Sequence, residues 1–288
     1  MAEPLSSVKM HNGNIMCLYK SDKKSEMYFN GNAYTDILNF IWFDFVQGAN
    51  IVFDLGANYG QFVLNPISKD TATKIEAAYC FEPNPKLANA LNESLKKSEL
   101  EQLVKVVPLG VSNDAGKFDF FINLYSSGGS SLDSDQAFNP LDGIYQLKTE
   151  VQTIRLDDFA NKEKLSVKGK SVALKIDVEG SDFLALEGAL PLLADAEEFL
   201  LIMETGKSSA EAFEKRFRDN DALSFFSQHH LYVTYQNQMI KVKDFYDYFS
   251  HFKNTRGSID IVVCTRPLDS NHYLNLAKSA KESMGLST

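Results

Sequence analysis

The chain has 288 residues, of which 44% are hydrophobic and 23% charged, a composition typical of soluble globular proteins and unlike that of disordered or collagen-like chains. Its 29 Lys and Arg residues against 38 Asp and Glu residues give a net charge of −9, which argues against binding nucleic acid or anionic lipid through the overall field. The most apolar window, residues 37–52, is interrupted by polar residues and falls short of the roughly 20 apolar residues of a membrane span.

The cysteine pattern bears on the cellular compartment. Cys17, Cys80 and Cys264 lie far apart and form no C-x-x-C pair, so they predict neither a disulfide framework nor a zinc site. The first residues lack the basic start and apolar stretch of a signal peptide. We therefore expect reduced thiols and a cytoplasmic location.

Residues 1–49 are expected to form an extension made of a hairpin and a helix. Asn12-Gly13 is a strong two-residue turn signal, and it predicts a hairpin over residues 9–19. From Tyr34 to Val46 the apolar residues follow the three-and-four spacing of a helix buried on one face, with Gly48 as its end.

Residues 50–288 are expected to form one α/β domain. Short apolar runs predict seven strands, at residues 51–53, 77–81, 104–109, 172–176, 199–203, 231–235 and 259–264. Most of the segments between the first five runs can be read as helical, which predicts a largely parallel sheet with helices on both faces. A polar helix from Asn271 is expected to close the chain.

Residues 114–150 depart from this alternation. Phe118, Phe120 and Ile122 alternate like a strand, and a loop rich in serine and glycine follows at residues 126–131. The segment is either an insertion near an active site, where its loop would close over a ligand, or a surface excursion. The sequence favours neither reading.

The first chemical signal is the segment I-V-F-D-L-G-A-N-Y-G-Q-F, residues 51–62, where a buried strand turns toward a helix. Gly56 and Gly60 allow a sharp turn and a close approach of the backbone to a ligand, and Asp54 can accept hydrogen bonds from loop amides or a ligand amine. The alternative is an ordinary strand–turn–helix whose glycines serve only the turn.

Glu82 ends the next predicted strand, where a carboxylate suits the two hydroxyls of a ribose. A dinucleotide-binding dehydrogenase would carry the same carboxylate. Its G-x-G-x-x-G fingerprint, however, requires glycine at two positions where this chain has Asn58 and Gln61. An adenosine ligand without a pyrophosphate, such as S-adenosylmethionine, fits better.

The second chemical signal is L-K-I-D-V-E-G, residues 174–180. Strand alternation puts Lys175, Asp177 and Glu179 on one side of a strand end. Because the ligand crevice of an open α/β sheet lies beyond the carboxyl ends of its strands, both carboxylates are expected to face a cofactor. Ser181 or Asp182 is expected to cap the helix that follows. The alternative is that Lys175 pairs with one carboxylate while the other caps the helix.

Six segments together carry a resemblance to a known family. They are V-F-D-L-G-A-N-Y-G, C-F-E-P-N-P, P-L-G-V-S-N-D-A-G, T-I-R-L-D-D-F, L-K-I-D-V-E-G-S-D and I-M-E, in this order between residues 50 and 205. The set resembles the FkbM family of S-adenosylmethionine-dependent methyltransferases. The resemblance implies a class I methyltransferase fold, which is Rossmann-like with a mostly parallel seven-stranded sheet and a reversed last strand. It also implies O-methylation of a hydroxyl on a sugar, a glycan or another small natural product.

The resemblance implies a set of cofactor-binding residues as well. They are Asp54, Gly56, Ala57, Asn58 and Gly60 in the first segment, Glu82 and Pro83 in the second, Gly110, Val111 and Ser112 in the third, and Asp177 in the fifth. The first segment would line the methionine side of the cofactor, Glu82 would bind the ribose, and residues 110–112 would flank the adenine.

Methyl transfer to an alcohol calls for a base, because a protonated oxygen is a poor nucleophile, and a positioned base contributes about 10²–10⁴-fold. Asp177 is the first candidate, with Glu179 and Glu204 as alternatives and a histidine as a less favoured one. These three carboxylates could instead hold Mg²⁺, since oxygen ligands suit hard cations, although we expect no metal.

The expected partner is a small-molecule or glycan acceptor, with no nucleic acid and no membrane. Two rival functions stay open. One is an NAD(P)-dependent Rossmann-type oxidoreductase, which Asn58 and Gln61 disfavour, and the other is a non-catalytic nucleotide-binding protein of the same fold. The C-terminal aromatic residues are expected in the core, or beside Arg256 along an acceptor pocket.

Overall fold

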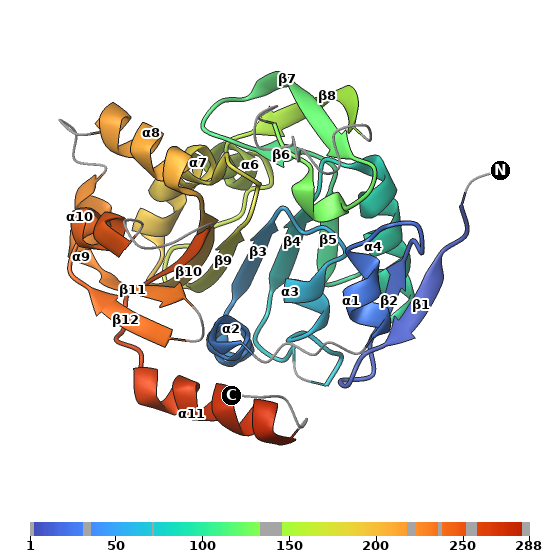
Figure 1. The fold of residues 1–288 in the computed structure, drawn as a ribbon, viewed down its shortest axis with the longest axis horizontal. Helices are drawn as coiled ribbons and strands as arrows, with labels where there is room; N and C mark the ends of the chain where they lie inside the picture. The colour runs from blue at the N-terminus through green and yellow to red at the C-terminus, as the bar shows by residue number, and fades with distance from the viewer. Residues whose placement is uncertain are drawn as a thin grey trace.

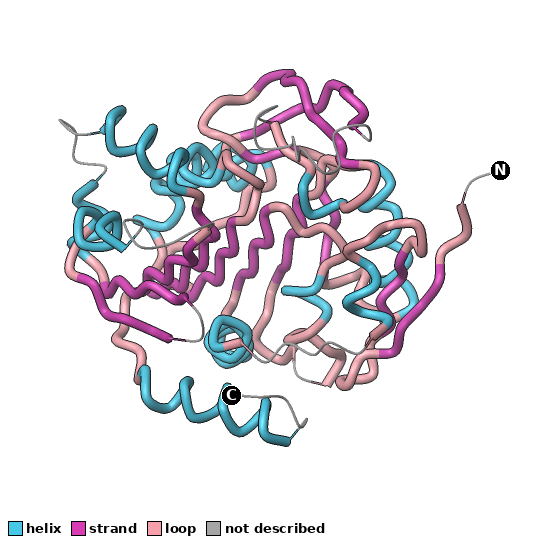
Figure 2. The backbone as a smooth tube through the Cα atoms, in the orientation of Figure 1, coloured by secondary structure: helices cyan, strands magenta, loops and turns pink. Residues whose placement is uncertain are grey.

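A computed structural model describes residues 3–30, 36–70, 72–132, 146–217, 223–235, 238–251 and 258–283. Its centre is an eight-stranded sheet with helices on both faces (Figures 1 and 2). The strands of this sheet are β3 (Ile51–Leu55), β4 (Ala77–Phe81), β5 (Val104–Val107), β9 (Ser171–Ile176), β10 (Glu198–Thr205), β11 (His230–Tyr235), β12 (Gln238–Val242) and β13 (Ile259–Cys264).

The strand order is β12-β11-β13-β10-β9-β3-β4-β5. From β10 to β5 all pairs are parallel, while β13 runs antiparallel between β10 and β11. The predicted class I arrangement with a reversed last strand is confirmed. The prediction of seven strands was one short, because β12 adds an edge strand in which only Met239 and Val242 are buried, so no apolar run marks it.

Helices cover both faces of the sheet. They are α1 (Ser25–Phe29), α2 (Ile37–Gly48), α3 (Gln61–Leu64), α4 (Pro85–Lys97), α6 (Leu156–Lys162), α7 (Asp182–Asp195), α8 (Lys207–Phe217), α9 (Ser224–Gln228), α10 (Phe245–Ser250) and α11 (Ser270–Ser283). Neighbouring residues of one strand serve opposite faces: Phe53 packs in the cluster with α6 and α7, and Val52 in the cluster with α2 and α4. A parallel sheet buried on both faces accounts for the nearly continuous apolar runs of the strands.

The first strands, β1 (Ser6–Lys9) and β2 (Ile15–Leu18), form the predicted hairpin, but its connection is longer than the predicted two-residue turn. Lys9 pairs with Ile15, and the side-chain amide of Asn12 instead donates to the carbonyl oxygens of Leu64 and Asn65, both at 2.8 Å. Tertiary hydrogen bonds therefore override the local turn preference.

The predicted helix before the first core strand is α2, which begins at Ile37 because the Asp36 side chain accepts a hydrogen bond from the Asn39 amide. Tyr34 lies outside the described residues. The helix ends at Gly48, as predicted. The domain boundary at residue 49 stays a prediction, and buried side chains on its two sides, such as Trp42 and Leu91, belong to one hydrophobic cluster.

A second sheet has three strands, β6 (Gly110–Val111), β7 (Gly116–Asn123) and β8 (Gln146–Ile154), in the order β6-β8-β7. The alternation at residues 118–122 correctly predicted the strand β7. In Figure 1 this small sheet stands beyond the upper ends of the central strands, and a short 3₁₀ helix, η1 (Ser127–Gly129), follows β7.

Two general expectations can be compared with the described residues. No helix within them is both long and apolar enough to cross a membrane. Cys17, Cys80 and Cys264 are free and buried. The cytoplasmic location stays a prediction.

Candidate functional site

A pocket lies at the carboxyl ends of β3, β4 and β9, under the loop that follows β7. Its empty space is about 570 Å³, open mouth included. We call it the first pocket. Most of the predicted cofactor-binding residues line it, namely Gly56, Asn58, Glu82, Pro83, Gly110, Val111 and Asp177.

The other predicted cofactor residues lie behind the walls of the first pocket. Asp54 and Ala57 are buried. A Cβ atom on Gly60 would come within 2.2 Å of the Leu91 side chain, so that glycine serves helix packing. The Ser112 amide donates to the Ile154 carbonyl at 3.1 Å. Their contribution to a ligand would be indirect.

The turn after β3 is shaped by the neighbouring strand end. Gly56 has a φ of +75°, and a Cβ atom there would lie 1.9 Å from the backbone oxygen of Asp177. Only glycine therefore allows the ends of β3 and β9 to approach so closely. Asn58 has a φ of +51°, a left-handed conformation that asparagine tolerates better than most residues.

Glu82 is held by two backbone amides. Its Oε1 accepts from Asn84 and its Oε2 from Asn58, both at 2.8 Å. Burial raises the pKa of Glu82 to about 7. Because each carboxylate oxygen has two acceptor sites, the group retains capacity for two more donors, which suits a pair of ribose hydroxyls.

Lys175 lies between two carboxylates. The parallel register places it beside Asp54, with Nζ 3.2 Å from Asp54 Oδ1 and 3.3 Å from Asp177 Oδ2. Its ammonium also donates to the Gly56 carbonyl at 2.8 Å. Neither Asp54 oxygen has a well-aligned hydrogen bond in the described part of the chain, so the ion pair is its main stabilisation. One ammonium between two carboxylates leaves negative charge at this end of the pocket when both are ionised.

Asp177 and Glu179 follow β9 and differ in acidity. Burial acts to raise the pKa of Asp177, but the Lys175 ammonium outweighs it and holds this pKa below its usual range. Burial, together with the charge of Asp177, raises the pKa of Glu179 to about 8. The backbone oxygen of Glu179 accepts a hydrogen bond from the Ser131 hydroxyl, which ties the inserted loop to this turn.

The expectation for the start of α7 was wrong. Ser181 is the N-cap residue but makes no capping hydrogen bond with its side chain. The Asp182 side chain instead accepts from the amides of Val178 and Gly180, at 2.9 and 3.1 Å, and so fixes the turn that carries Glu179. Lys175 does pair with Asp177, as the alternative reading held.

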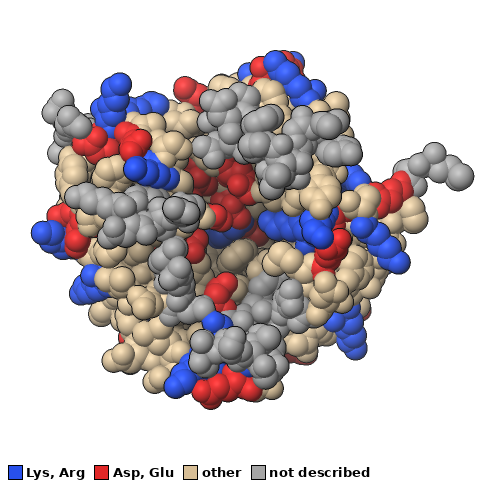
Figure 3. Space-filling model, in the orientation of Figure 1, with Lys and Arg blue, Asp and Glu red and all other residues tan. Residues whose placement is uncertain are grey.

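A second cavity adjoins the first at Asp177 and Glu179, and we call it the acidic cavity. Its empty space is about 1,040 Å³, open mouth included. Its lining carboxylates are those of Asp177, Glu179, Asp182, Glu204 and Glu211. Lys207, which lies 3.9 Å from Glu211, is the only cation among the described residues that line it. Figure 3 shows Asp and Glu side chains gathered in the middle of this face.

Several other candidates are not brought to the site. Within the described ranges, no group of three or more His, Cys, Asp or Glu side chains could hold a metal ion, so the alternative Mg²⁺ site finds no support. None of the five histidines lines either cavity. Phe226, Phe245 and Tyr248 are buried in the core, and Arg256 lies outside the described residues.

Two parts of the chain contribute residues that the motifs did not predict. Lys24, from the N-terminal extension, lines the first pocket, although it belongs to no motif and precedes the first one by a long stretch. Phe120, Ser127, Gly128 and Ser130 come from the inserted segment. Of the two readings of that segment, the one near the site is therefore correct, and its closure over a ligand stays a prediction.

Residues 54–238 match the methyltransferase FkbM domain, and no curated protein matches the chain. Among solved structures, a methyltransferase FkbM from Methylobacillus flagellatus KT is 15% identical with a TM-score of 0.45, covering 75% of this chain and 44% of that one. An O-methyltransferase from Bacillus cereus in complex with SAH is 12% identical, with a TM-score of 0.41 and coverages of 79% and 80%. An rRNA methylase from Streptococcus thermophilus is 10% identical, with a TM-score of 0.38 and coverages of 80% and 95%. Because the domain match spans more than half of its length, the chain belongs to the FkbM family of S-adenosylmethionine-dependent methyltransferases.

Proposed function

We propose that the chain methylates a hydroxyl of a sugar, a glycan or another small natural product. In this proposal S-adenosylmethionine occupies the first pocket and the acceptor occupies the acidic cavity. The observation that carries it is the junction of the two cavities at Asp177 and Glu179. Ligands in the two cavities would meet there, beyond the carboxyl ends of the strands, where α/β sheets bind ligands.

The walls of the first pocket suit an adenosyl ligand that crosses the strand ends. Leu109 and Val111, next to β5, offer apolar surface for the adenine, and Glu82 at the end of β4 offers acceptors for the ribose. Asp177, after β9 and held in its charged form, supplies negative charge for the sulfonium and the ammonium group. S-adenosylmethionine, when bound, supplies an electrophilic methyl group.

Glu179 is the proposed general base. A base works best with a pKa near the operating pH, and the pKa of about 8 at Glu179 meets this condition. Asp177, first in line from sequence alone, has its ammonium partner Lys175 at 3.3 Å and a lowered pKa, so we assign it to charge balance. The acceptor hydroxyl would give its proton to Glu179 as its oxygen takes the methyl group, leaving S-adenosylhomocysteine.

The acidic cavity favours acceptors rich in hydroxyl groups and disfavours phosphates. Its carboxylates accept hydrogen bonds from hydroxyls, and clustered negative charge repels a nucleic-acid backbone. The proposal therefore includes no nucleic acid as substrate, and RNA enters the test as the contrary outcome.

The first experiment is a thermal-shift titration with S-adenosylhomocysteine, NAD and NADP, in which we expect stabilisation by the first compound alone. Methyl transfer from labelled S-adenosylmethionine is then measured on hydroxylated sugars, polyketide alcohols and a tRNA–rRNA mixture. Incorporation into a sugar or an alcohol supports the proposal. Incorporation into RNA with none into hydroxylated small molecules would overturn the acceptor class and leave the methyl donor intact.

A further inference from the structure

Lys24 is a cation in the first pocket that none of the family motifs contains. It lies at the start of α1 and lines the pocket together with Asn58, Asp177 and Glu179. None of the ion pairs among the described residues includes it, and no hydrogen bond of its ammonium to a described side chain or carbonyl is present. Since no described carboxylate lies within ion-pair distance of its ammonium, Lys24 can bind an anionic group of a ligand in this pocket.

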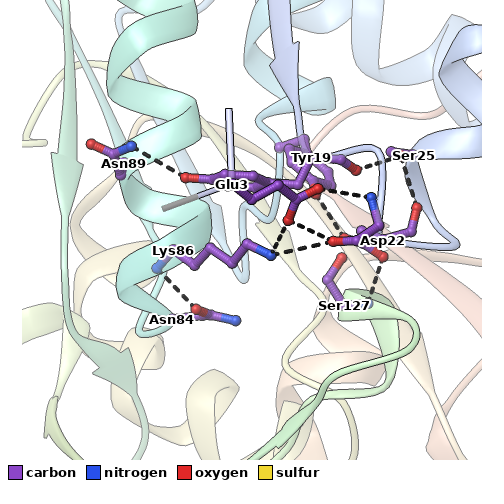
Figure 4. A network of polar contacts seen from close by, with 10 residues as sticks. Glu3, Tyr19, Asp22, Ser25, Asn84, Lys86, Asn89 and Ser127 are labelled. Carbon is purple, nitrogen blue, oxygen red and sulfur yellow. Dashed lines mark hydrogen bonds and ion pairs between the residues drawn. The ribbon is translucent and has the colours of Figure 1, made fainter. Parts of the chain in front are cut away.

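The backbone that carries Lys24 is fixed by a buried aspartate. Asp22 is 7% exposed, and its Oδ1 accepts from the amides of Lys24 and Ser127, both at 3.0 Å. Its Oδ2 accepts from the Tyr59 hydroxyl at 2.8 Å. Figure 4 shows Asp22 above Ser127, with the dashed contact between them. Asp22 thus joins the N-terminal extension, the turn after β3 and the inserted loop at one point.

The side chain of Lys24 lies along the inserted loop. A Cβ atom added to Gly128 would lie 3.1 Å from Lys24 Nζ and 3.0 Å from its Cδ, so glycine leaves the space that the lysine occupies. Burial acts to lower the pKa of Lys24, but Tyr28, Asp177 and Glu179 raise it above its ordinary value, so the side chain is charged at neutral pH. The ammonium is therefore a positive charge held over strand ends whose charged residues are mostly acidic.

The position of Lys24 along the pocket indicates which ligand group it meets. Since β5, β4, β3 and β9 are neighbours in this order, a ligand with its adenine beside Val111 and its ribose at Glu82 has its amino-acid end over β3 and β9. Gly56, Asp177 and Glu179 belong to that end, and so does Lys24, whose charge acts on the two carboxylates. The only anionic group of S-adenosylmethionine, its carboxylate, is on the amino acid.

We propose that Lys24 binds the carboxylate of the methionyl part of the cofactor, while Asp177 and Glu179 lie on the side of its ammonium and sulfonium groups. This inference rests on the proposed function. It gives the N-terminal extension a direct part in the cofactor site, through a residue that precedes the first motif of the family. The competing explanation is that Lys24 only balances the charges of Asp177 and Glu179.

The test compares two ligands that differ in one group. S-adenosylhomocysteine carries the carboxylate, and 5′-(3-aminopropylthio)-5′-deoxyadenosine is the same molecule without it. Calorimetry of the full chain should give an affinity about 10- to 100-fold higher for the first ligand, the range of a hydrogen bond between charged groups. In Lys24→Met, which keeps most of the apolar stem and removes the ammonium, this preference should fall to about 3-fold or less.

The control is Lys23→Met at the neighbouring lysine, which is exposed and paired with Glu26, and it should retain the wild-type preference. If Lys24→Met does not fold, Gly128→Ala provides the second measurement. The Cβ atom of the new alanine forces the end of the Lys24 side chain to shift by a few tenths of an ångström, while the charges of Lys24 and of the ligand carboxylate are kept. That variant should lose the same preference in part.

Each outcome decides between the explanations. Equal weakening of both ligands in Lys24→Met, or a wild-type chain that binds both ligands alike, would overturn the role of Lys24 and leave the methyltransferase site standing. A wild-type chain that binds neither ligand would overturn the occupant proposed for the first pocket.

Discussion

The first pocket and the acidic cavity share Asp177 and Glu179 but differ in everything else that lines them. The first pocket combines apolar surface from Leu109, Val111 and Phe120 with a cation from Lys24. The described lining of the acidic cavity consists of carboxylates, serines, glycines and Lys207, without any large apolar side chain. The first fits a ligand with a ring and charges of both signs, and the second fits a polar acceptor.

The shared wall between the cavities is itself divided. Asp177 has Lys175 as an ion-pair partner, and its lowered pKa keeps it charged. Glu179 has no ion-pair partner among the described residues, and its pKa is raised to about 8. Two carboxylates at the same strand end are thus suited to different tasks, because only one of them touches a buried ammonium.

The most direct way to break this comparison is Glu179→Gln. The amide keeps the shape of the side chain but cannot take a proton, so kcat should fall by about 10²–10⁴-fold while the affinity for S-adenosylhomocysteine changes little. Steady-state kinetics and calorimetry measure the two quantities. The matched control is Glu198→Gln. Glu198 is the first residue of β10, at the end of that strand away from the acidic cavity, and it pairs with Arg266. Near wild-type turnover in Glu179→Gln would move the base role to Asp177 or Glu204.

Glu82→Ala tests the ribose end of the first pocket. Loss of its hydrogen bonds should weaken S-adenosylhomocysteine by roughly 1.5–3 kcal/mol, the scale of hydrogen bonds to a charged group. Calorimetry at pH 8 is the measurement, because the pKa of about 7 leaves Glu82 ionised there. Glu163→Ala, at the C-terminal end of α6 and outside both cavities, serves as the control. An unchanged affinity would remove Glu82 from the site.

Asp22→Ala tests the contact that joins three segments above the first pocket. The variant removes the carboxylate that accepts hydrogen bonds from the amides of Lys24 and Ser127 and from the Tyr59 hydroxyl. The free energy of unfolding should therefore fall by about 1–3 kcal/mol. Denaturant titration measures this change. Lys24→Met should be far less destabilising, since it breaks none of these bonds, and equal losses of stability in both variants would contradict the assignment.

The pH dependence of turnover sharpens the division between Asp177 and Glu179. Glu179 acts as a base only when ionised, so kcat at saturating ligands should fall as the pH falls below its pKa, by about tenfold per pH unit. The midpoint should lie at about 8 or lower, since a bound sulfonium favours the ionised form. A profile that is flat from pH 6 to 9, roughly the window in which this group titrates, would exclude Glu179 as the base and return that role to Asp177, whose pKa is lowered, or to Glu204.

Most of the central fold could be predicted from the sequence, because strands buried on both faces leave apolar runs that do not depend on context. The strand β12 was missed for the opposite reason: an edge strand buries few side chains and leaves no such run. The turn at Asn12-Gly13 was placed correctly but its length was wrong, because Asn12 finds hydrogen bonds at Leu64 and Asn65 that lie far away in sequence.

The sequence by itself determined seven of the eight strands of the central sheet, the family, and the residues that stand at the carboxyl ends of β3, β4 and β9. These follow from local spacing, since a strand end and the turn after it lie next to each other in the chain. Only the tertiary structure decided that Asp54 pairs with Lys175 across a parallel register, that Lys24 reaches the first pocket, and that carboxylates from β10 and α8 join Glu179 around a second cavity. Contacts between residues so distant in sequence depend on how elements pack, and packing leaves no local pattern to read.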